Sequence, residues 1–531
     1  MSDMSVSGVN LTLIIQNVFS SDQEQRSQAE KQLHYLATTE GDFGLKLAAT
    51  IAKSDCSPPV RQLACVLLKQ YIQKHWSKAC DKFEEPEAPH RVKPEIRAIL
   101  LGCLGEPISR IRTGVASAVA CLAHLDWPRE WPEFYDHLLN ALNSPDPSVV
   151  HGAVRVFLEI ASDISDLQMK SIAPTVLPLL LRILTDKEKY SIRTRGRVLS
   201  IFSTFAEMIG YMNEIEKGVV KLLTPTLSGF VECFGQTLAE TNGFISDYGL
   251  KMNCIKALTV LVEKFPKLSQ GFMPKLFPIV CDLVAETCSA YCQAYVYCTC
   301  DKDDSVVDSE GEKYGLNGFI MAILNLMQAL VSSPRLGRTV LVPSMTALVY
   351  HLLMYMQIPD DKMSEWLADA ERYVEEEDEE GCVNTVRTDA LDVLLALGQD
   401  FEAETVAALG LAVPRLLAES LSALERRESK WWCLREVCWL VCGSLSVLLK
   451  KGHSHSGTGF DLMPIITQLL ETDLPQNELV FLQGQALWFA SRIVTLLPSE
   501  ITLKVVDASV RALSQTHHAV LRITAVKALS K

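Results

Sequence analysis

The sequence predicts an all-α protein built from stacked helix pairs. Helical periodicity runs through all 531 residues, and no sustained alternation typical of β-strands occurs. One helical pattern also recurs along the chain, which is the mark of a repeat array. Stacked helices form extended binding surfaces rather than catalytic clefts. We therefore expect an interaction protein.

The clearest helix runs from Pro58 to Trp76. Two prolines open it, because a fixed φ suits the first helical turn and the missing N–H is not needed there. Its apolar residues form one stripe at helical spacing: Val60, Leu63, Ala64, Leu67, Leu68 and Tyr71. The same opening, a β-branched residue or Leu followed by Arg at the start of an apolar helix, is found at Val60-Arg61, Ile111-Arg112, Ile192-Arg193, Val386-Arg387 and Leu521-Arg522.

Helix pairs can be assigned in order along the chain. Asp22 is a candidate N-cap, and Pro145-Asp146-Pro147 is expected to turn the chain inside the fourth pair. The first six pairs are predicted at 8–20 with 22–38, 42–53 with 59–76, 91–104 with 108–125, 131–142 with 147–163, 168–184 with 191–209, and 216–240 with 247–264. Insertions are expected near 301–312 and 360–383, and the last pairs at 403–422 with 429–450, 460–471 with 477–497, and 500–513 with 518–531.

Roughly eleven pairs, about 40 to 50 residues apart, have the spacing of HEAT repeats. The expected fold is an α-solenoid, wound as a right-handed superhelical array. We divide it into 1–165, 166–300, 301–383 with acidic insertions, and 384–531. The helix Val520–Leu529 ends the sequence without a polar capping repeat, so we expect a longer array.

Composition limits the classes of partner. The 64 acidic and 50 basic residues give a net charge of −14, which disfavours direct nucleic-acid binding and favours a basic protein partner. The 16 cysteines fit buried thiols in a reducing compartment, and Met1–Ser20 lacks the basic start of a secretory signal. Thr339–Ile358 is long enough to span a membrane, but its polar residues and Pro343 favour a helix buried between neighbours.

Six consecutive acids, Glu375, Glu376, Glu377, Asp378, Glu379 and Glu380, lie in the second insertion. Like charges repel one another, so this run predicts a solvated loop. It is either a solubilising spacer or a latch for a basic partner, and charge alone leaves both open. The insertion near 301–312 repeats the theme with Asp301, Asp303, Asp304, Asp308, Glu310 and Glu312.

No motif predicts catalysis, a cofactor or a metal site. Cys288, Cys292, Cys298 and Cys300 lack the paired spacing of a zinc site. Gly452–Gly457 lacks the second glycine and the preceding strand of a hydrolase elbow. Trp127 and Trp131, each followed by proline, are expected to pack between repeats.

Several separated motifs, in order, resemble the β-karyopherins, the importin and exportin transport receptors. The resemblance covers essentially the whole chain, although full receptors have nearly twice as many repeats. The motifs that carry it are Ala29–Leu33, Val60–Ala64, Leu68–Ile72, Trp127-Pro128, Trp131-Pro132, Val150–Val156, Ile192–Arg195 and Gln485–Trp488.

The resemblance implies a curved, monomeric receptor that shuttles between cytoplasm and nucleus without a membrane anchor. The second helices of its pairs are expected to bind GTP-loaded Ran and basic cargo such as core histones and ribosomal proteins. The first helices are expected to bind Phe-Gly nucleoporins. Arg61 is either a Ran contact or a tether between repeats. The alternative is a HEAT scaffold or regulatory subunit without a transport role. The expected Ran contacts are Gln62, Lys69, Gln70, Gln73, Lys74, Arg112 and Ser117.

Overall fold

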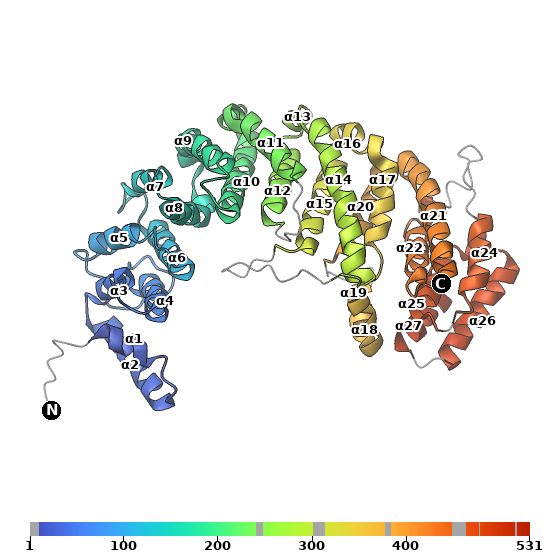
Figure 1. Ribbon diagram of the computed structural model, residues 1–531, viewed down its shortest axis with the longest axis horizontal. Helices are drawn as coiled ribbons and strands as arrows, with labels where there is room; N and C mark the ends of the chain where they lie inside the picture. Colours follow the sequence, from blue (N-terminus) through green and yellow to red (C-terminus); the bar gives the residue numbers. More distant parts are fainter. Residues whose placement is uncertain are drawn as a thin grey trace. The chain divides into compact units, whose positions relative to one another are not determined.

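The computed structural model describes residues 10–240, 248–300, 314–377, 384–448, 463–476, 478–515 and 518–530. Within these ranges the chain forms 26 α-helices and no strand (Figure 1). The first six helix pairs are α1 (Leu11–Asn17) with α2 (Gln23–Thr39), α3 (Phe43–Ala52) with α4 (Pro58–His75), α5 (Lys93–Gly102) with α6 (Ser109–Asp126), α7 (Phe134–Leu142) with α8 (Pro147–Ile160), α9 (Asp166–Thr185) with α10 (Ile192–Ile215), and α11 (Thr224–Ala239) with α12 (Gly249–Lys264).

Five further pairs follow, so the predicted all-α stack of about eleven pairs is confirmed for the described residues. Short helices interrupt this part of the chain: α13 (Pro266–Ser269), α16 (Pro334–Val340), α18 (Asp360–Ala368) and α19 (Ala370–Glu377). The pairs are α14 (Met273–Tyr291) with α15 (Leu316–Val331), α17 (Met345–Tyr355) with α20 (Val386–Asp400), α21 (Glu402–Glu425) with α22 (Trp431–Ser444), α24 (Met463–Asp473) with α25 (Val480–Arg492), and α26 (Ser499–Gln515) with α27 (Ala519–Leu529).

The described residues divide into two compact units, up to Cys233 and from Phe234 onward. In the first unit the second helices α4, α6, α8 and α10 pack on one another in order. In the second unit α12 packs on α15 and α15 on α20, while α22 packs on α25 and α25 on α27. The second helices of successive pairs therefore share one face within each unit. The division into four segments stays a prediction.

Local capping explains where several helices begin. The Asp22 carboxylate accepts a hydrogen bond from the Glu24 N–H at 2.9 Å, so the predicted N-cap is confirmed. Asp146 accepts from the Ser148 N–H at 2.8 Å, and Pro147 occupies the first turn of α8. Each contact satisfies a backbone donor that the helix itself leaves unpaired.

A polar side chain near the start of a second helix repeatedly reaches back to the end of the first helix of the same pair. It donates to a carbonyl that has no partner within that helix, and so ties the two helices together. In the fifth pair Arg195 makes this contact rather than Arg193, because α10 begins at Ile192 and Arg195 is its fourth residue. The contacts are Arg61 Nε to Ile51 O at 2.8 Å, Arg195 Nε to Leu184 O at 2.7 Å, Lys251 Nζ to Glu240 O at 2.6 Å, and Gln483 Nε2 to Leu474 O at 2.7 Å.

Buried ion pairs connect neighbouring repeats. Arg387 Nη2 of α20 donates to Glu436 Oε1 of α22 at 2.8 Å. Arg435 Nη1 of α22 donates to Asp473 Oδ1 of α24 at 2.6 Å, and Trp439 Nε1 donates to the other carboxylate oxygen at 2.9 Å. All these charged side chains are at most 5% exposed, so losing one partner would strand a buried charge.

The insertion predicted at 360–383 contains α18 and α19, so the loop predicted for the six-acid run was wrong for Glu375, Glu376 and Glu377, which end α19. Helices α18 and α19, which we call the α18–α19 hairpin, pack against α27. Trp366 of α18 and Tyr373 of α19 both face Phe481 of α25, with ring centroids 5.9 and 6.3 Å apart. These aromatic side chains anchor a segment that charge alone suggested was solvated.

Three helices are long and apolar enough to cross a membrane by length and composition: Asp166–Thr185, Pro334–Tyr355 and Glu402–Glu425. The predicted segment Thr339–Ile358 contains a 3-10 turn at Val342–Ser344, which separates α16 from α17. Its helix α17 packs against α14, α20 and α21. The apolar side chains of this segment thus pack against helices of neighbouring repeats, as predicted.

Trp131 is buried, with its ring 4.7 Å from that of Phe134 in its own repeat. The Arg97 guanidinium of α5, in the preceding repeat, lies 5.2 Å from the Trp131 ring centroid, so the predicted packing between repeats is confirmed for this residue. Trp127 is half-buried and lies edge-on to the same phenylalanine. All cysteines among the described residues are free thiols. Those buried in helices include Cys65, Cys233, Cys254, Cys438 and Cys442.

Candidate partner-binding surfaces

The exposed polar side of α4 is the first candidate surface. Gln62, Gln70 and Gln73 are exposed, whereas Val60, Ala64, Leu68 and Tyr71 are buried in the core. The apolar stripe read from the sequence is therefore the packed side of the helix. The three amides lie away from it, each able to donate and accept hydrogen bonds.

Two lysines expected on this surface are already engaged within the chain. Lys69 Nζ donates to Ser117 Oγ of α6 at 2.6 Å, so the structure brings two predicted site residues together. Lys74 Nζ donates to Glu84 Oε1 at 2.7 Å. Both lysines are half-buried and already bonded within the chain, and their contact with a partner stays a prediction. A partner would have to displace or share these bonds.

The two arginines of this region differ in role. Arg61 is buried; besides its bond to a carbonyl of α3, its Nη1 lies 3.2 Å from Glu106 Oε1 and its Nη2 2.5 Å from Glu106 Oε2. It is thus the tether between repeats. Arg112 is half-buried and donates from Nη1 to the carbonyl oxygens of Glu106 and Pro107.

The six-acid run is only partly solvated. Glu375 is exposed at the end of α19, but Glu376 accepts from Lys362 Nζ at 2.8 Å and from Trp366 Nε1 at 3.0 Å, which corrects the expectation that the run packs nothing. The helix that carries these two acids, α19, packs on α27, the second helix of the last pair. The side chain of Glu377, the segment Asp378–Glu380 and the acids of 301–312 lie outside the described residues.

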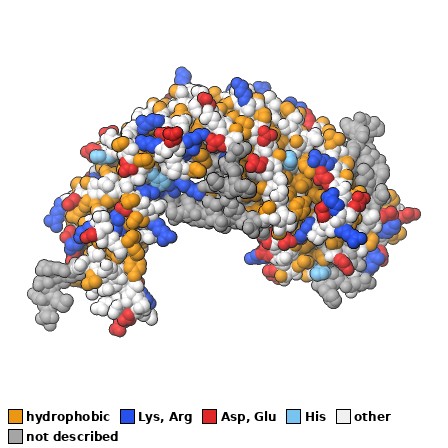
Figure 2. Space-filling model, in the orientation of Figure 1, with side chains coloured by type: hydrophobic (Ala, Val, Ile, Leu, Met, Phe, Trp, Pro, Cys, Tyr) orange, Lys and Arg blue, Asp and Glu red, His pale blue; other side chains and the backbone are white. Residues whose placement is uncertain are grey.

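Acidic and basic side chains are interspersed on the visible face of each unit (Figure 2). The net charge of −14 is therefore not gathered there into one continuous acidic patch. A basic partner would be recognised by local groups of acids rather than by a uniformly negative surface.

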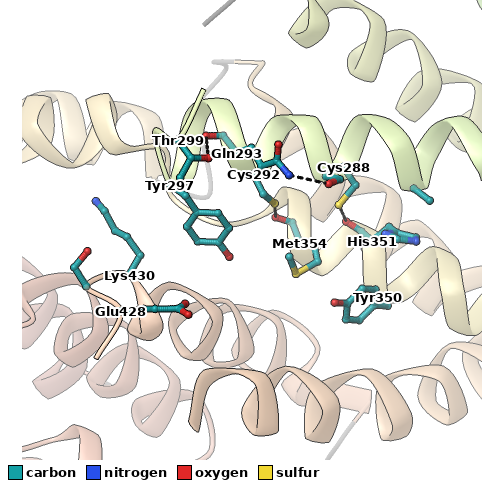
Figure 3. Close-up of a pocket in the computed structure, with 13 residues that line it drawn as sticks. Cys288, Cys292, Gln293, Tyr297, Thr299, Tyr350, His351, Met354, Glu428 and Lys430 are labelled. Atoms are coloured by element: carbon teal, nitrogen blue, oxygen red, sulfur yellow. Dashed lines mark hydrogen bonds between the residues drawn. The ribbon is translucent and has the colours of Figure 1, made fainter. Parts of the chain in front are cut away.

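A pocket of about 680 Å³ opens between α14, α17 and the connection from α21 to α22. Figure 3 shows Cys288 and Cys292 on one side facing His351 and Met354 of the neighbouring helix. Tyr297 follows the π-helical turn Cys292–Val296 and projects toward the same space. The connection from α21 to α22 contributes Glu428, Ser429 and Lys430.

The polar groups of this pocket are fixed by neighbours. The Tyr350 hydroxyl donates to the Glu419 carboxylate at 3.0 Å, and the Arg415 guanidinium lies 3.7 Å from the ring centroid. Burial, then the charge of Glu419, raises the pKa of Tyr350 to about 12, so the phenol is neutral. A second pocket of about 530 Å³ shares Tyr297, Glu428 and Lys430 with the first, so the two adjoin, and we call the first pocket the groove. The groove suits a chain segment that inserts an apolar side chain.

The four cysteines near this groove do not come together around a common point. The Cys288 thiol faces the His351 carbonyl at 3.8 Å, and Cys298 and Cys300 are exposed. Among the described residues, no cluster of three or more His, Cys, Asp or Glu side chains could hold a metal ion.

Sequence reasoning identified neither this groove nor the positively charged group formed by Arg112, His151, Arg155 and Arg197. The second could have been found from helical register, because His151 and Arg155 are four residues apart on α8. The groove depends on residues of three separate helices and had no local signal.

Two known families match adjacent parts of the chain. The profile of the Importin-beta N-terminal domain matches residues 29–106, and that of the Exportin 1-like protein family matches residues 109–234. Together they cover the helices that carry the exposed amides and the tether Arg61.

Curated relatives match over most of the chain. Importin-9 of Drosophila melanogaster is 28% identical over 523 residues, covering 97% of this chain and 50% of the relative. Importin subunit beta-5 of Schizosaccharomyces pombe is 26% identical over 454 residues, covering 81% of this chain and 44% of the relative. The chain thus spans about half the length of the curated relatives it matches.

Solved structures share the fold. The exportin Cse1 in its cargo-free, cytoplasmic state matches with a TM-score of 0.61 and 14% identity, over 98% of this chain and 56% of that one. Kap121p bound to RanGTP matches with a TM-score of 0.57 and 17% identity, over 98% of this chain and 48% of that one. These likenesses confirm the HEAT-solenoid fold.

Proposed function

The chain is a member of the importin-β superfamily, and on that basis we propose that it acts as a nuclear import receptor. The observation that carries the proposal is the relationship to Importin-9, which extends along 97% of this chain. The receptor binds GTP-loaded Ran and basic cargo, crosses the nuclear pore, and shuttles between cytoplasm and nucleus as a monomer. It works by binding and release, not by catalysis.

Ran contacts the second-helix side of α4 and α6. Gln62, Gln70 and Gln73 supply exposed amides, and Ser117 lies beside them through its bond with Lys69. Exposed amides cost little to desolvate and add directional hydrogen bonds. The half-buried Lys69, Lys74 and Arg112 contribute charge at the edge of this surface.

Cargo is basic, with core histones and ribosomal proteins as the expected classes. The excess of 14 acidic charges favours encounter with cationic proteins. Glu375 is exposed at the end of α19, which packs on α27, and the six-acid run adds a local excess of negative charge to the sequence. Glu376 is already bonded to Lys362 and Trp366, so it contributes less than the exposed Glu375.

Phe-Gly segments of nucleoporins dock in the groove of Figure 3. It lies between α14 and α17, both first helices of their pairs, and Tyr297, Tyr350 and Met354 offer apolar contact to an inserted phenyl ring. Single contacts of this kind are weak, and repeats along one chain gain by multivalency. Titration of the chain with a labelled Phe-Gly peptide checks this assignment: Met354→Lys should abolish saturable binding, and unchanged binding would remove the groove from consideration.

The decisive experiment is retention of Ran on the immobilised chain, with Ran loaded with GTP or with GDP. A transport receptor retains the GTP form selectively. A scaffold or regulatory subunit without a transport role retains both forms equally or neither.

Matched variants locate the Ran surface. Gln62→Ala, Gln70→Ala and Gln73→Ala, combined, remove three exposed amides from α4 and should weaken GTP-Ran binding by at least about tenfold. The control combines Asp136→Ala, His137→Ala and Asn140→Ala, three exposed polar residues of the first helix α7. Equal loss in both variants would exclude α4 as the contact, while leaving GTP selectivity as an independent test of the receptor function.

A further inference from the structure

Three sulfur-bearing side chains line one wall of the groove. Cys288 and Cys292 are four residues apart, near the end of α14 and at the start of the π-helical turn that follows it. Met354 of α17 completes the set, and Figure 3 shows the two cysteines facing it across the contact between the helices. We call these three residues the sulfur cluster. Its members are 62 positions apart between Cys292 and Met354, so no local spacing in the sequence reveals it.

A buried glutamine connects the sulfur atoms. Gln357 Nε2 donates to Cys292 Sγ at 3.4 Å and to Met354 Sδ at 3.8 Å, so both sulfur atoms are neighbours of one amide nitrogen. Gln357 is fully buried, and its Oε1 accepts a hydrogen bond from the Tyr297 hydroxyl at 3.1 Å, which fixes the orientation of the amide. An N–H group aimed at sulfur favours the thiolate form of the cysteine over the thiol.

The two thiols contact one another as well as the protein backbone. The hydrogen bond with Cys292, and then burial, raise the pKa of the Cys288 thiol. The thiols also donate weakly to carbonyl oxygens of α17, Cys288 to that of His351 at 3.8 Å and Cys292 to that of Met354 at 3.7 Å. Both cysteines are 3% exposed, and the side that they do expose faces the groove. A small ion can therefore reach the sulfur atoms from the groove, whereas a larger reagent meets buried thiols.

The kinds of donor atom decide which ion would suit the cluster. Two thiolates and a thioether are soft ligands, which select Cu(I) over ions that prefer oxygen. Structural Zn²⁺ sites have four ligands, nearly always Cys or His. No third His, Cys, Asp or Glu joins these two cysteines in a metal-binding group within the described part of the chain. The set is thus too small for zinc and is complete for a soft ion with three sulfur ligands.

We propose that the sulfur cluster binds one Cu(I) ion through Cys288 Sγ, Cys292 Sγ and Met354 Sδ. The two thiol protons leave to solvent when the ion binds, and the oxidation state of copper does not change. Gln357 acts behind the ligands, as the hydrogen-bonded partners of metal ligands commonly do. The π-helical turn that begins at Cys292 fits this assignment, since such turns are frequent at functional sites. The site goes beyond the proposed import function and does not depend on it.

The test uses the full chain without oxygen, with Cu(I) supplied alone and the coloured chelator bicinchoninate as competitor. The wild-type chain should retain one Cu(I) ion against the chelator. Cys292→Ala should weaken the affinity by about a hundredfold or more, and Met354→Leu, which keeps the apolar volume, by about tenfold. X-ray absorption at the copper edge should report three sulfur neighbours in the wild type and two in Met354→Leu, a change that loss of packing alone would not produce.

Two controls separate this cluster from the other thiols of the chain. Cys438 and Cys442 have the same spacing on α22 and are also buried, but they line neither of the two pockets. Cys442→Ala should therefore change the affinity less than twofold. Cys298 and Cys300 are exposed, and replacing both by Ser should likewise change it less than twofold.

Three outcomes would overturn the proposal. Complete transfer of Cu(I) from the wild-type chain to bicinchoninate would mean that the chain has no such site. Losses in either control as large as that in Cys292→Ala would mean adventitious binding to thiols in general. Unchanged affinity in Cys292→Ala and in Met354→Leu, each with a circular dichroism spectrum like that of the wild type, would exclude the cluster. None of these measurements uses Ran or a Phe-Gly peptide, so they are separate from the tests of receptor function.

Discussion

Replacing Arg61 by methionine should destabilise the first repeats without changing their exposed surface. The guanidinium is 6% exposed and its partner, the Glu106 carboxylate, 10% exposed. Methionine keeps the aliphatic length but leaves a buried carboxylate without its cation and the Ile51 carbonyl without its donor. Stranding one member of a buried pair costs about 3 to 5 kcal/mol, and the lost bond to the carbonyl is part of the same network rather than a separate addition.

The assay must be local, because an array of repeats does not unfold in a single two-state step. Hydrogen exchange followed by mass spectrometry reports the opening free energy of peptides from α3, α4 and α6 separately. Arg61→Met should lower that free energy by about 3 to 5 kcal/mol in these helices. The double variant Arg61→Met with Glu106→Leu should recover most of it, because two apolar side chains of similar volume replace the pair.

The control is Lys170→Met, which removes a surface pair with Glu216 of the same unit. That pair is 2.6 Å long, but its side chains are 40% and 63% exposed, so its loss should cost about 0 to 1 kcal/mol. Two results would refute the reasoning. One is an equal loss of hydrogen-exchange protection in Arg61→Met and Lys170→Met. The other is a double variant whose loss equals the sum of the losses in Arg61→Met and Glu106→Leu measured separately.

Three further predictions concern packing, pH and the acidic run. Gly152→Ala should destabilise the first unit by about 1 to 3 kcal/mol in thermal melts, because an added Cβ would lie 2.2 Å from the backbone oxygen of Leu104, which follows α5. The control Gly102→Ala, with open space around the added Cβ, should be neutral or slightly stabilising. Because burial and then nearby arginines lower the pKa of His151 to about 3, the unfolded chain takes up the imidazole proton at higher pH than the folded chain does. The contribution of His151 to the free energy of unfolding is therefore fully present above pH 6.5 and is lost as pH falls toward 3, by at most about 1.4 kcal/mol per pH unit. The melting temperature of His151→Gln should accordingly depend less on pH between 7 and 5 than that of the wild type. Glu376→Ala should lower the opening free energy of the α18–α19 hairpin by about 1 to 3 kcal/mol in hydrogen exchange, since it accepts two side-chain hydrogen bonds, whereas Glu375→Ala should shift it by less than about 0.5 kcal/mol.

Much of the fold was predictable because it depends on local signals. Apolar spacing located α4, proline and Asp146 marked the start of α8, and Asp22 was recognised as a cap. These features act within a few residues of chain, which a sequence displays directly. The array of pairs followed from their repetition.

The surfaces were less predictable, because they depend on contacts between distant segments. Charge predicted that Glu376 is solvated, but Trp366 and Lys362 draw it onto the hairpin. Helical register identified Lys69 as a polar side chain, yet its bond to Ser117 spans 48 positions. An amino-acid pattern shows which side of a helix is apolar, and not what the polar side finds in the next repeat.

The α18–α19 hairpin has a mechanical consequence for the second unit. In an array where each pair touches only its neighbours, every junction is a hinge that flexes on its own. The hairpin follows α17 in the sequence and contacts the turn Cys292–Val296, α25 and α27. It therefore connects helix pairs that are not neighbours in the array. The α18–α19 hairpin should therefore couple the motions of the junctions between the pairs that it connects. This stretch of the chain should therefore behave as one stiff unit, and bending should occur at the junctions that the hairpin does not cross.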